Sequence, residues 1–166
     1  MTLWVLCTVL VMQAQIKVLG IGNSFSEDAL EQNISEIALT DGTPMIIANM
    51  YIGGCSIDRH VGNIEGNKAD YRYTKFSVDG QKTIREKVSL ESIINEEEWD
   101  YISVQEGGGF HGFYDKTFNG TSHSMEPDLT VLTDYVLQNR PGKKTKLVLA
   151  EGFNHPATSA KAKSVS

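Results

Sequence analysis

The chain has 166 residues, which is enough for one domain with a hydrophobic core and too few for two. Its 40% hydrophobic and 22% charged residues are typical of a soluble globular protein. The formal net charge of -6 and the lack of any Lys/Arg cluster argue against nucleic acid as a partner.

The first segment, MTLWVLCTVLVMQAQ at residues 1–15, is the one continuous apolar run. It is too short for a stable membrane span, and it matches the hydrophobic region of a secretory signal with a cut near Ala14 or Gln15. The alternative is a buried first strand. Cleavage would remove Cys7 and leave Cys55 as the single cysteine, which excludes an intrachain disulfide. A secreted or periplasmic location is therefore predicted.

After the signal, strands and helices alternate along the chain. Runs of branched apolar residues predict core strands at residues 16–21, 44–51, 99–105 and 145–153. Helical spacing or helix-start signals predict helices from Ser26 to Gly42, over 90–97 and over 127–137, and Asp79-Gly80 predicts a hairpin over 71–84. Residues 110–124 show no periodicity and are expected to form a loop. This order predicts an α/β fold, a three-layer α/β/α sandwich with a mostly parallel sheet over residues 16–153, followed by a polar tail at 154–166.

Polar or glycine-containing turns follow all four predicted core strands. Ligands of such sheets bind beyond the carboxyl ends of the strands. The turns at those ends are Gly22-Asn23-Ser24, Gly53-Gly54, Gln105-Glu106 and Glu151-Gly152. Their clustering predicts a functional site at this edge.

The first of these turns, Gly20-Ile21-Gly22-Asn23-Ser24, allows several interpretations. Nucleotide binding is disfavoured, because Phe25 occupies the place of the third fingerprint glycine and no lysine follows for a P-loop. A nucleophile at Ser24 would lie near the positive end of a helix dipole, where backbone N–H groups can receive an oxyanion. Gly22 would permit the sharp turn, and Asn23 can tie it to a neighbouring loop. The alternative is that Ser24 or Ser26 caps the helix.

Three blocks resemble the SGNH/GDSL hydrolase superfamily: GNSFS at 22–26, YIGGCSIDRH at 51–60 and WDYISVQEGG at 99–108. The set is most similar to a secreted bacterial branch with a Gly-Asn-Ser-Phe-Ser first block, and the resemblance runs from residue 16 to about residue 150. It implies a flavodoxin-like fold and a serine esterase with Ser24 as the nucleophile. The oxyanion hole would consist of the Ser24 N–H, Gly54 (or Gly53) and Gln105, which replaces the asparagine usual in the superfamily. The implied substrates are acyl esters, in particular acetyl esters of carbohydrates, and no cofactor or metal is expected.

The base that activates the serine is missing from its usual place. The superfamily takes it from an Asp-x-x-His block, but Ile57, Gly108, Gly120 and Gly152 stand three positions before the four histidines. We therefore expect a truncated and impaired enzyme, with a complete protein carrying a disordered tail as the alternative. Of the four histidines, His155 is the first candidate for a substitute base. The remaining candidates for the neighbourhood of the site are Glu106, Arg59 and an exposed or substrate-binding His60, with His111 and His123 in the long loop.

Two other functions stay open. The chain can be an inactive fragment or pseudoenzyme that keeps the fold. It can also be a non-enzymatic carbohydrate-binding module, for which the aromatic residues Tyr71, Tyr73 and Phe76 of the hairpin would be the sugar-binding surface. Cys55, a small thiol beside two glycines, is expected to serve packing.

Overall fold

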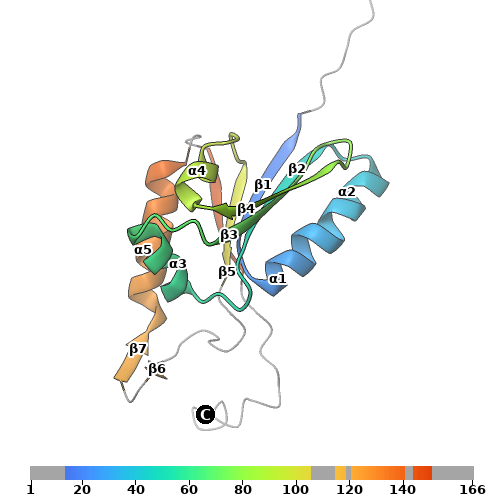
Figure 1. Ribbon diagram of the computed structural model, residues 1–166. Helices are drawn as coiled ribbons and strands as arrows, with labels where there is room; N and C mark the ends of the chain where they lie inside the picture. Colours follow the sequence, from blue (N-terminus) through green and yellow to red (C-terminus); the bar gives the residue numbers. More distant parts are fainter. Residues whose placement is uncertain (1–13, 106–114, 119–120, 141–143, 151–166) are drawn as a thin grey trace, which may run out of the picture.

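A computed structural model describes residues 14–105, 115–118, 121–140 and 144–150 (Figure 1). Its main sheet has six strands in the order β4-β3-β2-β1-β5-β8. The strands are β1 (Ile16–Gly22), β2 (Met45–Tyr51), β3 (Tyr71–Phe76), β4 (Lys82–Val88), β5 (Tyr101–Gln105) and β8 (Lys146–Ala150). β2, β1, β5 and β8 pair in parallel, whereas β3 and β4 form an antiparallel hairpin beside β2. The four predicted core strands are thus parallel neighbours, as expected.

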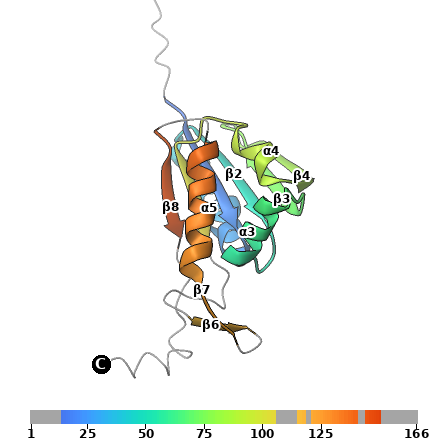
Figure 2. The same ribbon diagram turned by 90° about the vertical axis from the view of Figure 1, so that its left-hand side faces the viewer.

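Helices cover both faces of this sheet (Figures 1 and 2). One layer is a continuous helical segment made of α1 (Ser24–Ser26), the π-helix η1 (Glu27–Ile34) and α2 (Ser35–Asp41). The other layer contains α3 (Ile57–Glu65), α4 (Leu90–Ile94) and α5 (Met125–Asn139). The predicted α/β/α sandwich is confirmed.

The helical segment after β1 differs from an ordinary amphipathic helix. It ends at Gly42, which takes φ of 73° and so adopts the left-handed conformation that favours glycine at this position. Its middle part, η1, is wound as a π-helix, and the N–H of Ser35 bonds to the carbonyl of Leu30. Such segments are uncommon and occur often at functional sites.

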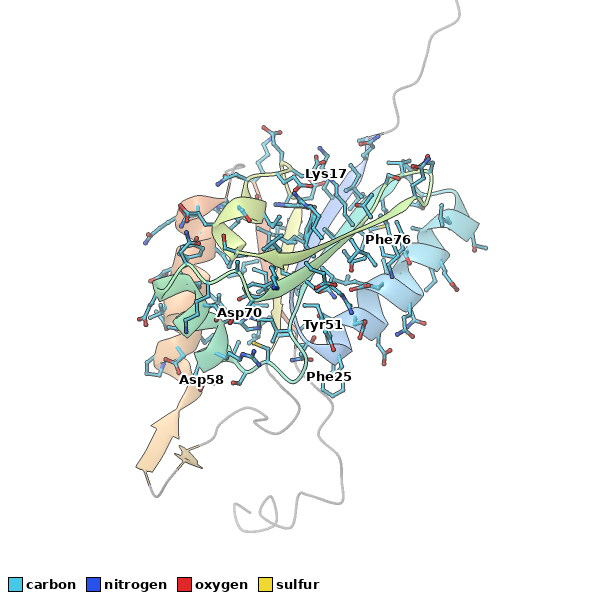
Figure 3. The ribbon with its side chains drawn as sticks, viewed as in Figure 1. Lys17, Phe25, Tyr51, Asp58, Asp70 and Phe76 are labelled. Atoms are coloured by element: carbon cyan, nitrogen blue, oxygen red, sulfur yellow. The ribbon has the colours of Figure 1, made fainter. Side chains whose placement is uncertain are left out.

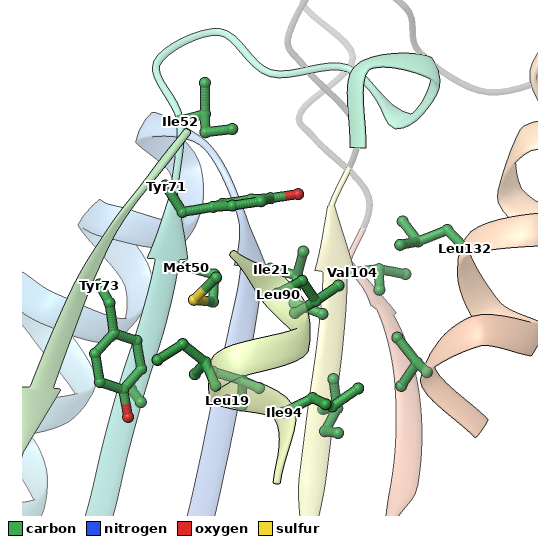
Figure 4. Packing of buried hydrophobic residues seen from close by; sticks show 14 of the residues in the cluster. Leu19, Ile21, Met50, Ile52, Tyr71, Tyr73, Leu90, Ile94, Val104 and Leu132 are labelled. Atoms are coloured by element: carbon green, nitrogen blue, oxygen red, sulfur yellow. The ribbon is translucent and has the colours of Figure 1, made fainter. Parts of the chain in front are cut away.

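The larger part of the core lies between the sheet and the α3–α5 layer. Trp99 is 2% exposed, and its indole N–H donates to the carbonyl of Ile94 at 3.1 Å. Figure 4 shows Leu132 of α5 and Val104 of β5 meeting across this layer. A smaller cluster around Leu30, Ala38 and Ile47 packs the other helical layer onto β1 and β2.

Three predictions about elements or surfaces need correction. The segment expected to be a loop contains the antiparallel strands β6 (Asp115–Phe118) and β7 (Thr121–Ser124). The missed signal is Asn119-Gly120 between them, a pair that favours two-residue hairpins. The helix predicted over 90–97 ends at Ile94. The hairpin residues Tyr71 and Tyr73 are 0% and 1% exposed, so they belong to the core and offer no sugar-binding surface.

Several expectations fall on other parts of the chain. The predicted signal covers residues 1–15, of which 1–13 lie outside the described residues, and the predicted polar tail at 154–166 lies outside them as well. Within the described ranges, no helix has the length and apolar character needed to cross a membrane.

Candidate active site

The carboxyl edge of the sheet has a topological switch point beside β1. The chain passes from β1 to β2 on one side, whereas β5 lies on the other side of β1. Doubly wound sheets bind their ligands outside the strand ends at this kind of position. The turn after β1 and the last residue of β5, Gln105, both lie there.

The turn after β1 is held by hydrogen bonds on both sides of Ser24. Asn23 is the N-cap of the helix, and its side-chain oxygen accepts from the N–H of Phe25 at 3.1 Å. Its amide nitrogen donates to the carbonyl of Cys55 at 3.0 Å, while the N–H of Ile52 donates to the carbonyl of Gly22 at 3.1 Å. Asn23 therefore ties the first turn to the second, as predicted from the sequence.

Ser24 itself is exposed, and its hydroxyl makes no hydrogen bond to any described residue. The capping interpretation does not apply to it, because the helix is capped by Asn23. Ser26 is 5% exposed, and its hydroxyl lies 2.8 Å from the carbonyl oxygen of Asn23. The Ser24 hydroxyl thus faces solvent, whereas the Ser26 hydroxyl is buried and hydrogen-bonded within the protein.

The second turn, Gly53-Gly54, follows β2 at the same edge. The N–H of Cys55 donates to the carbonyl of Ile52 at 3.1 Å and closes the turn around the two glycines. Gly54 has φ of 60°, as the third residue of a type II turn requires. Both glycines are exposed, so their backbone faces the solvent beside the first turn.

Gln105 reaches the first turn from β5. It is 7% exposed, and its Oε1 lies 3.1 Å from the position that a Cβ on Gly22 would occupy. The same Cβ would lie 2.8 Å from the Oγ of Ser26. Gly22 is therefore needed for the close approach of the two side chains. In Figure 3, Phe25 and Asp58 lie at this edge and Lys17 lies at the opposite one.

His60, predicted to be exposed or substrate-binding, is instead buried. It is 0% exposed; its Nδ1 lies 2.8 Å from the Tyr71 hydroxyl and 3.6 Å from the Cys55 sulfur. Burial, assisted by the charge of Arg59, lowers the pKa of His60 to about 4, so its ring is neutral at pH 7. The signal for this placement is helical spacing, because Ile57, His60 and Val61 share one face of α3.

The other sequence candidates are distributed differently. Arg59 is exposed on α3, and Cys55 is buried in the core, in agreement with its expected packing role. His123 is on β7, whereas Glu106, His111 and His155 lie outside the described residues. Among the side chains that the structure describes, no three His, Cys, Asp or Glu residues gather where a metal ion can bind.

Sequence reasoning missed a buried polar group behind the first turn. Asn49 of β2 is 0% exposed and Glu31 of η1 is 8% exposed, and the two are hydrogen-bonded. The available signal is Asn49 itself, a polar residue inside the apolar run MIIANMY. A buried amide of this kind must find hydrogen-bond partners.

Comparison with known proteins places these features in a family. The chain matches the family of a domain of unknown function, DUF4886, over residues 17–165. It is similar to a DUF4886 family protein from Bacteroides uniformis whose crystal structure is known at 1.50 Å resolution, with a TM-score of 0.73 and 43% sequence identity. The match covers 82% of this chain and 49% of that one, so the chain spans about half the length of that relative. Comparison with curated proteins finds no match.

Proposed function

Since this chain belongs to the DUF4886 family, we infer its function from its own site and propose an SGNH-type serine esterase domain with Ser24 as the nucleophile. The observation that carries the proposal is the first turn. Its one exposed hydroxyl, that of Ser24, stands at a helix start beside the switch point, between neighbours that are both hydrogen-bonded.

The proposed reaction is acyl transfer followed by hydrolysis. Ser24 Oγ attacks the ester carbonyl, and the alcohol leaves as the acyl group becomes bonded to Ser24. The developing oxyanion would be stabilised by the N–H of Ser24, the N–H of Gly54 and the amide of Gln105. Water then releases the acid. The resemblance of the three blocks to SGNH hydrolases makes acetyl esters of carbohydrates the proposed substrates.

The proton of Ser24 needs an acceptor, and this requirement limits the proposed activity. No histidine of the sequence follows an aspartate at the Asp-x-x-His spacing, and the described His60 is buried against Tyr71. His60 is the one histidine whose side chain the structure describes, so we expect water and buffer to take the proton and both acylation and deacylation to be slow. A catalytically inactive domain is the alternative that the same observation favours.

Slow deacylation makes the acyl-enzyme itself the best evidence. We expect that the full chain, incubated with an aryl acetate at mildly alkaline pH, gains one acetyl group on Ser24, detected by peptide mass spectrometry. Ser89 is the internal control, because it stands at the start of another helix, as the N-cap of α4. Ser24→Ala should abolish the modification. Equal acetylation of Ser89 and Ser24, or none at Ser24, would remove the nucleophile assignment.

A further inference from the structure

A chain of buried polar contacts runs from the first turn to the hairpin edge of the sheet. The hydroxyl of Ser26 lies within hydrogen-bond distance of two acceptors, the carbonyl of Asn23 at 2.8 Å and Oδ1 of Asn49 at 2.9 Å. Nδ2 of Asn49 donates to Oε1 of Glu31 at 2.9 Å. The three side chains therefore come from three different elements, α1, β2 and η1.

These contacts end at the buried carboxylate of Glu31, whose charge is compensated by two cations. The carboxylate of Glu31 lies 3.1 Å from a terminal guanidinium nitrogen of Arg72 and 3.3 Å from Nζ of Lys82. The Arg72 nitrogen also pairs with Glu27 at 2.6 Å, and its guanidinium lies 4.2 Å from the ring centroid of Tyr51. A buried ion pair is weak evidence for stability, because well-packed apolar residues often replace it without loss. Its directional contacts do fix the orientation of the groups that it touches.

In the π-helical segment η1, two consecutive side chains are buried against the sheet. Leu30 and Glu31 are neighbours in the chain, yet they are 6% and 8% exposed. Leu30 packs over Gly20, where an added Cβ would lie 2.3 Å from its Cδ1, while Glu31 reaches Asn49. The helix that begins at Ser24 is thereby attached to β2, and β2 leads directly into the Gly53-Gly54 turn.

We propose that Ser26, Asn49 and Glu31 are positioning residues that set Ser24 relative to the Gly54 turn. The inference rests on the proposed function, since it assumes that Ser24 is the nucleophile. The Ser26 hydroxyl has one proton, for which the Asn23 carbonyl and Oδ1 of Asn49 are the two acceptors. Glu31, oriented by Arg72, accepts from Nδ2 of Asn49 and so keeps its Oδ1 turned toward Ser26. None of the three needs to touch the substrate. Their removal should leave a folded protein whose Ser24 is poorly placed.

The test is the rate of Ser24 acetylation by p-nitrophenyl acetate in the full chain, with the melting temperature of each variant measured beside it. Asn49→Asp places two carboxylates against each other, and acetylation should slow about tenfold or more, because small misplacements of a reacting group have effects of this size. Adding Glu31→Gln restores a donor between positions 31 and 49. The double variant should return to within roughly threefold of the original rate, as expected for directly coupled residues.

Glu97→Gln is the matched control. Glu97 also pairs with two cations, Lys17 at 2.8 Å and Lys75 at 2.7 Å, but next to the start of β1 at the opposite edge of the sheet. It should lower the melting temperature and leave the acetylation rate unchanged. If Asn49→Asp fails to fold, Ser26→Ala replaces it and should slow acetylation as well.

The outcomes separate the two proposals. Folded Asn49 or Ser26 variants that react at the original rate overturn the positioning role alone. The same follows if the double variant stays as slow as Asn49→Asp, or if Glu97→Gln slows the reaction equally. Absence of acetylation at Ser24 in the unaltered chain overturns the proposed function, and the positioning role with it.

Discussion

Two buried or crowded residues near the candidate site have measurable consequences, and His60 is the first. The pKa of His60 is about 4 in the folded protein, compared with 6.5 for an ordinary histidine. The unfolded chain therefore binds a proton in this range that the folded chain does not bind. The contribution of neutral His60 to the free energy of unfolding is fully present above the unfolded pKa, and it is lost as the pH falls from about 6.5 towards 4.

We expect the free energy of unfolding to decrease by roughly 3 kcal/mol across that window, since each pKa unit corresponds to about 1.4 kcal/mol. Urea unfolding at several pH values between 7 and 4 measures this change. His60→Gln should flatten the profile in the same window. An unchanged slope in that variant would show that another group is responsible.

Gly22 is the second such residue. A Cβ at this position would lie 2.8 Å from Ser26 Oγ and 3.1 Å from Gln105 Oε1. We expect Gly22→Ala to destabilise the protein by about 1–3 kcal/mol through overpacking. Gly62→Ala on α3 is the control, because nothing lies within 4 Å of its Cβ position and the change should stabilise the helix by about 0.5–1 kcal/mol. The melting temperatures of both variants test this expectation. Similar changes in melting temperature for Gly22→Ala and Gly62→Ala would contradict the steric argument.

At the scale of elements, the β3–β4 hairpin is joined to the segment after α4 by ion pairs. Glu96 accepts from Tyr73 at 3.1 Å and from Lys75 at 2.9 Å, and it also pairs with Arg85. Burial raises the pKa of Glu96, but the hydrogen bonds from Lys75 and Arg85 outweigh it and hold the pKa below its usual value of 4.5. This contribution to stability is present above pH 4.5 and is lost as the pH falls below it.

Glu96→Gln should therefore lower the stability at pH 7 by about 1 kcal/mol or less, because the pair is partly exposed. It should also reduce the loss of unfolding free energy below pH 4.5. The pH dependence between 4.5 and 6.5 should stay unchanged, because it comes from His60. Chemical denaturation at pH 7, 5 and 3.5 separates the two contributions. If Glu96→Gln instead removed the pH dependence of stability between pH 4.5 and 6.5, this assignment of the two pH ranges would be contradicted.

The sequence was sufficient for elements that depend on local patterns. Branched apolar runs located the parallel strands, and Asp79-Gly80 located the β3–β4 hairpin. It was insufficient where geometry depends on distant partners. The residues of η1 suit an α-helix as well as a π-helix, and the burial of Glu31 depends on Arg72, 41 residues away. For the same reason, the tie between Asn23 and the Cys55 loop was predictable from the turn, whereas the Ser26–Asn49–Glu31 contacts were not.

For the whole molecule, the two faces of the sheet are covered unequally. The α3–α5 layer buries Leu132 completely, whereas on the other face Tyr101 of β5 and Val148 of β8 are 36% and 42% exposed. The α1–α2 layer packs on β1 and β2, next to these two strands. Most of the hydrophobic stabilisation thus comes from the α3–α5 side.

Leu132→Ala should accordingly cost about 2–5 kcal/mol, as for other fully buried leucines. Val148→Thr should change stability by no more than about 0.5 kcal/mol, because its side chain is already largely in water. Urea denaturation compares the two. Equal losses of unfolding free energy in the two variants would mean that the face of the sheet carrying Val148 is covered in solution.

The central proposal is that Ser24 is an esterase nucleophile for which the described residues supply no base. It is tested most directly by p-nitrophenyl acetate hydrolysis, with and without added imidazole, for the unaltered chain and Ser24→Ala. Loss of triad members from a serine hydrolase lowers turnover by about a millionfold, so hydrolysis without imidazole should barely exceed background. Imidazole can take the proton of the exposed Ser24 hydroxyl, and it should accelerate the unaltered chain well beyond Ser24→Ala. Equal imidazole dependence in the two proteins would contradict the claim, and robust activity without imidazole would contradict the missing base.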